Sequence, residues 1–580
     1  MRKHLLWMVA LTLAALALPP TTMDAQDKDD KSASKPEAAK PDQFKAEERR
    51  SKGSVTAGGK LVNYDAVAGT LVVHPKGWDD VPQNADPNDK SQPAEASMFY
   101  VAYFKSADGG SDDSKGEVKK GDKKSGTRKD DDKKSDDKKA DEKHWEQTDS
   151  QRPVTFLYNG GPGSSTVWLH MGAFGPRRVV TADSIHTPAA PYPVVNNDYS
   201  LLDVSDLVFV DAPGTGFSRI SGKDREKAFY GVDADAQAFA DFIVQFLAKY
   251  GRWNSPKYVF GESYGTTRSA VLSNVLETER DVDFNGVILL SQILNFDFSA
   301  DGPQFNPGMD MPYQLVLPTY TASAWYHHKL PEAHAELAPL LAEVEHFAMN
   351  EYAQALGEGS ALPAEQRHAI AAKLHGYTGL STEYIEKSDL RINAGQFEKM
   401  LQDENDTTTG RLDTRFSGPT IDPLSKEAEY DPQSAAIASA YVSAFNDYVR
   451  NSLKFGEKLT YKADIDVEKS WDFLHQPPGA EQKVPGALNV MPDLAVAMKQ
   501  NPKLKIMLNG GYYDLATPYF AAVFEMRQLP IEASLQNNIE MHFYTSGHMV
   551  YAHEPDLKAL HANVAAFIDK TKGGMAEASP

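Results

Sequence analysis

The pentapeptide GESYG, residues 261–265, constrains the fold of this 580-residue chain more than any other feature. It lies directly between a short apolar run, KYVF, and a stretch with helical character, residues 266–280. A Gly-x-Ser-x-Gly sequence in this context is typical of a strained strand-to-helix turn that projects the serine above the end of a sheet. The context indicates that Ser263 is a nucleophile, whereas an isolated match would indicate only an ordinary turn.

Short apolar runs alternate with helical patterns on both sides of this motif. The expected strands are residues 154–158, 207–213, 257–260, 286–291, 504–511 and 539–544, and the expected helices are residues 233–249, 266–280, 518–527 and 554–570. Apolar strands separated by helices indicate a parallel sheet with both faces covered. We therefore predict an α/β fold with a mostly parallel central sheet and helices on both faces.

The middle of the chain, residues 301–484, lacks this alternation. Helical patterns dominate it, such as PEAHAELAPLLAEVEHF and PQSAAIASAYVSAFNDYVRNSLKF. We interpret it as a helical insertion, or cap. The cap would divide the core into two parts, residues 54–300 and 485–572, which together complete one sheet, and residues 573–580 would form a tail.

The region before residue 154 is expected to add strands of its own. Residues 60–74 suggest two short strands around a turn near Ala68 and Gly69, and MFYVAYF, residues 98–104, suggests a further strand. Residues 106–150 mix lysine and aspartate with almost no large apolar residues, so they cannot bury enough surface to offset their conformational entropy. We interpret them as a disordered, solvated loop inserted between two paired strands.

The N-terminus has the pattern of an export signal. Arg2 and Lys3 precede an apolar run from Leu5 to Leu18, and a cleavage point is possible after Ala25. We expect residues 1–25 to be a signal peptide and residues 26–53 to be a disordered leader, with order beginning near Val55. The expected location is then periplasmic or secreted; a membrane anchor or a buried helix is the alternative for this run.

The mature chain shows no second apolar run of about 18 residues, so we expect no integral membrane segment. Although disulfides are common in exported proteins, this sequence contains no cysteine. Its stability must therefore come from packing.

A serine nucleophile needs a base and a residue that orients the base. For a Gly-x-Ser-x-Gly elbow the expected chain order is serine, then an acid, then histidine, the last two on loops after late strands. Asp514 in NGGYYDLATP and His548 in TSGHMVY fit this order and these positions. His553 is the nearby alternative, but Glu554 and Pro555 place it at the start of the last helix, where a surface or capping role is expected.

The oxyanion that develops during acyl transfer needs preorganised N–H donors. One donor is expected from Tyr264, directly after the nucleophile. The other is expected from the NGGPG loop, residues 159–163, where glycines allow the backbone to approach a substrate closely. A tight turn without a functional role is the alternative for this loop.

Charge and motif content exclude other classes. The formal net charge of −21 would repel a phosphate backbone, so nucleic acid is not an expected partner. The sequence has no HExxH motif and no cysteine ligand, the adjacent His327 and His328 would point in different directions, and no GK[ST] follows the glycine-rich loop. We therefore expect no metal and no cofactor. The oligomeric state cannot be predicted from these patterns.

Four motifs in order resemble the serine carboxypeptidases. YNGGPGSS is similar to that family's WLNGGPGCSS, DAPGTGFS (residues 211–218) to its DxPxGxGFS, GESYG to its GESYA, and SGHMV to its GHMVP. The resemblance implies an α/β-hydrolase fold with Ser263 as nucleophile, His548 as base and Asp514 as orienting acid. It also implies that Gly161 and Tyr264 donate the oxyanion-hole N–H groups.

The resemblance further implies a site for the terminal carboxylate of a peptide. In the family an asparagine, a glycine and two glutamates bind that carboxylate, and Asn159, Gly160 and Glu262 match three of these positions. The fourth falls on Ala173, so Glu262 would lack the like-charge neighbour that raises a carboxyl pKa. Arg177 or Arg178 could bind the carboxylate instead.

The first functional hypothesis is therefore a peptidase that removes C-terminal residues through an acyl-enzyme at Ser263, with a peptide as its substrate. A serine esterase or acyltransferase on the same scaffold is the second. A catalytically silent binding protein is the third, and the presence of all three expected catalytic residues argues against it.

Overall fold

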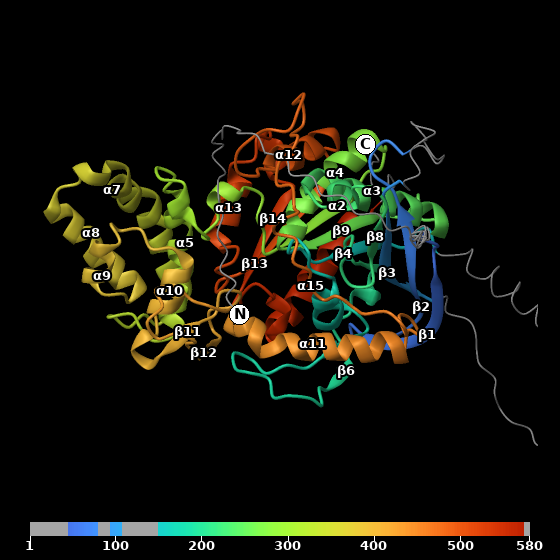
Figure 1. Cartoon of the computed structure of the whole chain (residues 1–580), viewed down its shortest axis with the longest axis horizontal. Coiled ribbons are helices and arrows are strands. Elements are labelled where there is room, and N and C mark those ends of the chain that lie inside the picture. The colour runs from blue at the N-terminus through green and yellow to red at the C-terminus, as the bar shows by residue number, and fades with distance from the viewer. Residues whose placement is uncertain (1–43, 79–92, 107–148, 574–580) are drawn as a thin grey trace, which may run out of the picture. The chain divides into compact units, whose positions relative to one another are not determined.

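The computed structural model describes residues 44–78, 93–106 and 149–573. The expected signal peptide, most of the expected leader, nearly all of the charged insert and most of the tail lie outside these ranges. In the described part, one sheet of ten strands forms the centre of the fold, in the order β1-β2-β3-β7-β4-β9-β10-β13-β14, with β8 pairing with β3 (Figure 1). The strands are β1 (Glu48–Ala57), β2 (Lys60–Val73), β3 (Glu95–Lys105), β4 (Val154–Tyr158), β7 (Asp206–Val210), β8 (Arg219–Ser221), β9 (Lys257–Glu262), β10 (Gly286–Leu290), β13 (Lys505–Gly511) and β14 (Ile539–Tyr544).

The strands β7, β4, β9, β10, β13 and β14 are neighbours in this order and run parallel to one another. The antiparallel pairs are β1 with β2, β2 with β3, and β3 with β7 and β8. Two parts of the chain separated by the helical insertion contribute to the parallel region, because β10 pairs with β13. The predicted α/β-hydrolase fold class, with a mostly parallel sheet, is confirmed.

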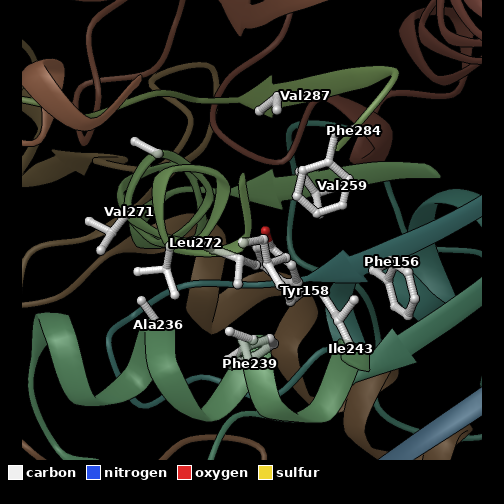
Figure 2. Close-up of a cluster of buried hydrophobic side chains, with 14 of the residues drawn as sticks. Phe156, Tyr158, Ala236, Phe239, Ile243, Val259, Val271, Leu272, Phe284 and Val287 are labelled. Atoms are coloured by element: carbon white, nitrogen blue, oxygen red, sulfur yellow. The ribbon is translucent and has the colours of Figure 1, made fainter. Parts of the chain in front are cut away.

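Alternate residues of the strands enter two separate hydrophobic clusters, one on each face. Phe156, Val259 and Leu289 belong to the first cluster, which α3 (Val232–Tyr250), α4 (Tyr264–Glu279) and α12 (Met491–Gln500) cover. Figure 2 shows side chains of α3 and α4 pointing toward this face of the strands. Leu157 and Phe260 belong to the second cluster, which α11 (Pro432–Asn451) and α15 (Glu554–Thr571) cover.

This doubly covered sheet explains how the chain folds without disulfides. Complete burial of a large apolar side chain contributes about 1.5–3 kcal/mol, and both clusters contain many side chains of this size with almost no exposed surface. No helix among the described residues has the length and apolar character needed to cross a bilayer.

The first strand corrects the predicted leader boundary. β1 begins at Glu48, inside the expected leader, and pairs along its whole length with β2. β2 is also one long strand, where two strands around Ala68 and Gly69 were predicted; the turn lies at Gly58 and Gly59, both at positive φ. The charged residues of β1 resemble a disordered segment by composition, but an edge strand can carry them because its outward side chains remain in water.

The pairing of the strands beside the charged insert also differs from the prediction. The insert joins β3 to β4, and these strands are not neighbours, because β7 lies between them and pairs with both. A local hairpin was the simplest interpretation of two apolar runs with a loop between them. The sheet instead places a later strand in that position.

The helical insertion is shorter than predicted. Its own hydrophobic cluster is built mainly from α5 (Met311–Tyr326), α6 (Leu337–Phe347), α7 (Ala353–Glu358), α8 (Ala364–Thr378), α9 (Thr382–Lys387) and α10 (Ala394–Met400). A two-stranded hairpin follows, β11 (Thr407–Thr409) and β12 (Ser417–Pro419). We call residues 301–419 the cap, and Figure 1 shows its helices grouped apart from the strands of the central sheet.

The last part of the predicted insertion, residues 432–484, packs on the core instead. The apolar side of α11 enters the second sheet cluster through residues such as Tyr441 and Phe445. Farther along, Ile465 N donates to Gly163 O at 2.9 Å and Ser165 N donates to Ala463 O at 2.8 Å. The helical period of α11 predicted an amphipathic helix correctly, but a period does not specify which surface the apolar side will cover.

Candidate active site

Ser263 lies at a strained turn between β9 and α4, as the sequence predicts. Its backbone has φ 61° and ψ −131°, which is rare for a residue with a side chain. Backbone strain of this kind costs of order 1–3 kcal/mol and occurs mainly at functional positions. Gly261 is required by close packing, because a Cβ there would lie 2.2 Å from Gly265 O. The turn thus has the geometry of a nucleophile elbow.

Asp514 and His548 are hydrogen-bonded to each other. Asp514 follows β13, His548 follows β14, and their Oδ2 and Nδ1 atoms are 2.8 Å apart. Asp514 is completely buried and His548 is 5% exposed. Thr517, which sequence reasoning missed, donates its N–H to Asp514 Oδ1 at 3.0 Å and its hydroxyl to Oδ2 at 2.7 Å. These bonds fix the carboxylate in the orientation that holds the imidazole.

The strand β10 connects this pair to the elbow. Ser263 N donates to Leu290 O at 3.0 Å, and the next residue, Ser291, donates its hydroxyl to His548 O at 2.7 Å. Ser263 and His548 therefore contact adjacent residues at the end of β10. Ser263 Oγ forms no hydrogen bond within the described ranges, which is common for a catalytic group before substrate binds.

The environment of His548 favours its protonated form. Burial acts to lower the pKa of the imidazole, but the charge and hydrogen bond of Asp514, together with the charge of Glu262, raise the pKa above its usual value of 6.5. A histidine whose pKa is raised in this way accepts a proton from an alcohol more readily than an isolated imidazole does.

The NGGPG loop lies against the elbow. A Cβ on Gly160 would lie 2.4 Å from Tyr264 N, and Gly161 has φ +104°. Only glycine adopts that backbone conformation at low cost. The structure therefore brings together the two segments that were predicted to supply oxyanion-hole donors, Gly161 and Tyr264.

Glu262 is buried directly beside Ser263. Asn159 Nδ2 donates to its Oε2 at 2.8 Å, and Tyr551 OH donates to Oε2 at 2.8 Å and to Oε1 at 3.1 Å. Burial raises the pKa of Glu262 to about 7, despite the lowering effects of His548, Tyr551 and Asn159. The pKa of Glu262 is therefore raised although Ala173 stands where the family has a second glutamate; burial is the main cause, and the charge of Asp514 adds to it.

Tyr551 is the second functional residue that sequence reasoning missed. Its ring lies against the short helical turn Leu169–Phe174, which contains Ala173; a Cβ on Gly172 would lie 2.6 Å from that ring. The tyrosine hydroxyl contacts Glu262, and its ring packs beside Gly172, the neighbour of Ala173 in the chain. The only sequence signal was an aromatic residue three positions after the predicted base.

The remaining candidates lie outside this group. His553 Nδ1 is 2.9 Å from Asp556 at the start of α15, and its side chain is 19% exposed. Arg178 pairs with Glu554 at 2.6 Å and lines a cavity of about 240 Å³, together with Tyr441 and Tyr551. Arg177 lies in β5 (Arg177–Val179) and acts electrostatically on tyrosines 64, 103 and 448.

A metal site was not predicted for His327 and His328. In the structure, His327 Nε2 contacts Thr414 O at 2.6 Å. Within the described ranges, no group of three or more metal-binding side chains converges.

Comparison with known proteins agrees with the motifs. Residues 143–300 match the family model described as serine carboxypeptidase. The chain resembles the serine carboxypeptidases. The matched segment contains the NGGPG and GESYG motifs, whereas Asp514 and His548 lie beyond it and are brought to the site by the fold.

Two curated relatives give the same result over a similar length. The serine carboxypeptidase-like 33 of Arabidopsis thaliana is 30% identical over 137 residues, which cover 22% of this chain and 26% of the relative. The carboxypeptidase Y homolog of Arthroderma benhamiae is 29% identical over 142 residues, 24% of this chain and 26% of the relative. The chain thus spans about a quarter of the length of the curated relatives it matches.

Among the solved structures that this chain resembles is a proline iminopeptidase of Mycobacterium smegmatis. It is 12% identical in sequence, and the superposition covers 73% of this chain and 91% of that one with a TM-score of 0.30. A peroxisomal alpha-beta-hydrolase of Saccharomyces cerevisiae is 9% identical, with a TM-score of 0.29 over 93% of both chains. The fold assignment itself follows from the strand order and the elbow geometry.

Proposed function

We propose that this protein is a serine carboxypeptidase that cleaves peptide bonds near a free C-terminus. Ser263 is the nucleophile, His548 the base and Asp514 the residue that orients the base. The N–H groups of Gly161 and Tyr264 stabilise the oxyanion, while Asn159, Gly160 and Glu262 bind the terminal carboxylate of the peptide.

The reaction follows from these positions. His548 Nε2 removes the proton from Ser263 Oγ as that oxygen attacks the scissile carbonyl carbon, and the negative charge that develops on the carbonyl oxygen is bound by the two N–H groups. The imidazolium then protonates the leaving amine, the C–N bond breaks, and an acyl-enzyme remains. Water activated by the same imidazole hydrolyses the ester and releases Ser263.

The observation that carries the proposal is the burial of the Glu262 carboxyl group beside Ser263. It is adjacent to the nucleophile, 2% exposed and hydrogen-bonded by Asn159. With a pKa of about 7, this carboxyl group is neutral in mildly acidic solution. A neutral carboxyl group can donate a hydrogen bond to a peptide's terminal carboxylate, whereas an ionised one would repel it.

A pair of substrates tests exopeptidase specificity. Blocked dipeptides with a free or an amidated C-terminus should be compared at pH 6, with Ser263→Ala as the inactive control. We expect kcat/KM to be at least about tenfold higher for the free carboxylate, since the amide lacks the charged group that Glu262 and Asn159 bind. Equal cleavage of both substrates would contradict the exopeptidase assignment, and turnover of small esters without peptide cleavage would favour the esterase alternative.

The proposed location is outside the cytoplasm, periplasmic or secreted. The proposal is supported by the positive residues and the apolar run of residues 1–25. Comparing the N-terminal sequence of the protein recovered from the exported fraction with that of the full chain would test it; an intact residue 1 on cytoplasmic protein would contradict it.

A further inference from the structure

The loop between β11 and β12, residues 410–416, extends from the rest of the cap and contacts both loops that carry the proposed acid and base. We call it the cap loop. His548 N donates to Leu412 O at 2.6 Å, and Gly547 N donates to Asp413 Oδ2 at 3.2 Å. On the other side, Leu515 N donates to Arg411 O at 3.0 Å, and Thr414 N donates to Tyr513 O at 2.9 Å. The residues on either side of Asp514 are therefore bonded to the same short loop as His548.

Asp413 is the centre of these contacts. It is completely buried, and its carboxylate accepts hydrogen bonds from Arg415 N and from the Arg415 guanidinium at 2.7–3.2 Å. Arg415 in turn lies 3.3 Å from Asp183 and 6.0 Å from the centre of the Tyr513 ring. The ion pair thus fixes the shape of the cap loop against the core.

The contact with the base loop is close-packed. A Cβ on Gly547 would lie 2.3 Å from Leu412 O and 2.5 Å from the Asp413 Cα. The cap loop is held from behind as well, because Asp431 Oδ1 accepts the N–H of Arg411 at 2.7 Å, and Ser323 on α5 donates to the Thr414 hydroxyl at 2.7 Å. A shift of the cap loop would therefore move the backbone of His548.

We propose that Asp413 is a positioning residue for the catalytic base, acting through Gly547 and the cap loop. This inference rests on the proposed roles of His548 and Asp514. A displacement of about 1 Å at a catalytic group can lower turnover about 100-fold without changing how substrate binds.

The chain offers a matched control. Asp310 also pairs with an arginine of the cap, Arg391, through bonds of 2.7 and 2.8 Å. It is only slightly exposed, and none of its bonds reaches the loops of Asp514 or His548 within the described residues. Asp310→Ala therefore removes the same kind of ion pair from the cap without removing the contact to the base loop.

The test uses a fluorophosphonate, which reacts with an activated serine and requires no peptide substrate, together with steady-state cleavage of a free-carboxylate dipeptide. For Asp413→Ala we expect the maximal labelling rate and kcat to fall about 100-fold, with KM within about threefold of the unaltered protein. Asp413→Asn keeps an acceptor for the Gly547 N–H, so its labelling rate and kcat should be about tenfold higher than those of Asp413→Ala. Asp310→Ala should stay within about twofold.

The outcomes separate the two proposals. Equal losses in Asp413→Ala and Asp310→Ala, or a loss confined to KM, would overturn the positioning role while leaving the peptidase assignment intact. No labelling of the unaltered protein would overturn both. Should Asp413→Ala fail to fold, Asp413→Asn decides the question: a kcat about tenfold lower with unchanged KM supports the role, and an unchanged kcat overturns it.

Discussion

Two buried histidines of this protein are paired with aspartates, but in different ways. His548 contacts one carboxylate, Asp514, through Nδ1 at 2.8 Å. His475 contacts two, Asp233 through Nδ1 at 2.5 Å and Asp493 through Nε2 at 2.8 Å. The first lies at the carboxyl edge of the parallel strands. The second joins the loop after α11 to α3 and α12.

The difference explains which histidine can perform acid–base chemistry. A base needs one ring nitrogen held by a partner and the other available to a substrate or nucleophile. Both nitrogens of His475 are occupied, so its imidazolium is a structural cation between two carboxylates. Although burial acts against the charge, these aspartates raise the pKa of His475 to about 9.

The largest expected effect separates the two rings directly. His548→Ala should lower kcat by about 10⁴ to 10⁶, because the serine loses its base. The same substitution at position 475 should leave kcat of the folded enzyme within about threefold, because that ring does not contact the reacting atoms. Steady-state kinetics on a free-carboxylate dipeptide, corrected for folded fraction by circular dichroism, would measure both, and similar losses would contradict the distinction.

Substitution of the acid partners extends the comparison. Asp514→Asn should lower kcat by about 10⁴ with little change in KM, because an amide at this position favours the wrong imidazole tautomer. Asp233→Asn alters the equivalent partner of His475 and should have less than about a threefold effect on kcat. A mild effect at Asp514 would show that His548 needs no orienting carboxylate.

Stability should respond in the opposite way. His475→Ala leaves the buried Asp493 without its cationic partner, with the Asn274 amide still donating to it, and we expect the free energy of unfolding to fall by about 3–5 kcal/mol. Chemical denaturation followed by fluorescence at pH 7 would measure this loss. A loss below about 1 kcal/mol would mean that the bridge is structurally dispensable.

The pH dependence of that contribution has a definite sign. The folded-state pKa of His475, about 9, exceeds the ordinary value of 6.5, so folding favours the protonated ring. Its stabilising effect is complete below about pH 6.5 and is lost as the pH rises through about 9. The Tm of the unaltered protein should therefore decline over this range more steeply than that of His475→Ala.

The smallest expected effect concerns Glu262, the carboxyl group beside the nucleophile. For free-carboxylate substrates, kcat/KM should fall about fivefold between pH 7 and pH 8 as Glu262 ionises with a pKa of about 7 and repels the substrate. Glu262→Gln cannot ionise and should abolish this decline while leaving activity near pH 6 similar. An amidated substrate serves as the control, since its turnover should lack this decline in both proteins.

The parts of the fold that follow from local patterns were predicted well. The parallel strands are apolar runs with clear ends, and the elbow joins a strand to a helix around a fixed motif, so Ser263, Asp514 and His548 could be placed from chain order alone. The resemblance to a known family supplied Glu262 and Asn159, and the structure shows them hydrogen-bonded to each other.

The features that sequence missed depend on tertiary contacts. The polar strand β1 is stabilised by pairing with β2, and its own composition does not favour a strand. Tyr551 and Thr517 acquire their roles only when loops distant in sequence meet. Asp413 is one of many aspartates in the cap, and nothing in its local sequence indicates a contact with the loop of His548.

The central claim is that Ser263 is activated by His548. Its most direct test is to label the protein with a fluorophosphonate and to locate the adduct by mass spectrometry of its peptides, in the unaltered protein and in His548→Ala. The account predicts a single adduct on Ser263 that is lost in the variant. An adduct on another residue, or unchanged labelling of Ser263 without the imidazole, would contradict it.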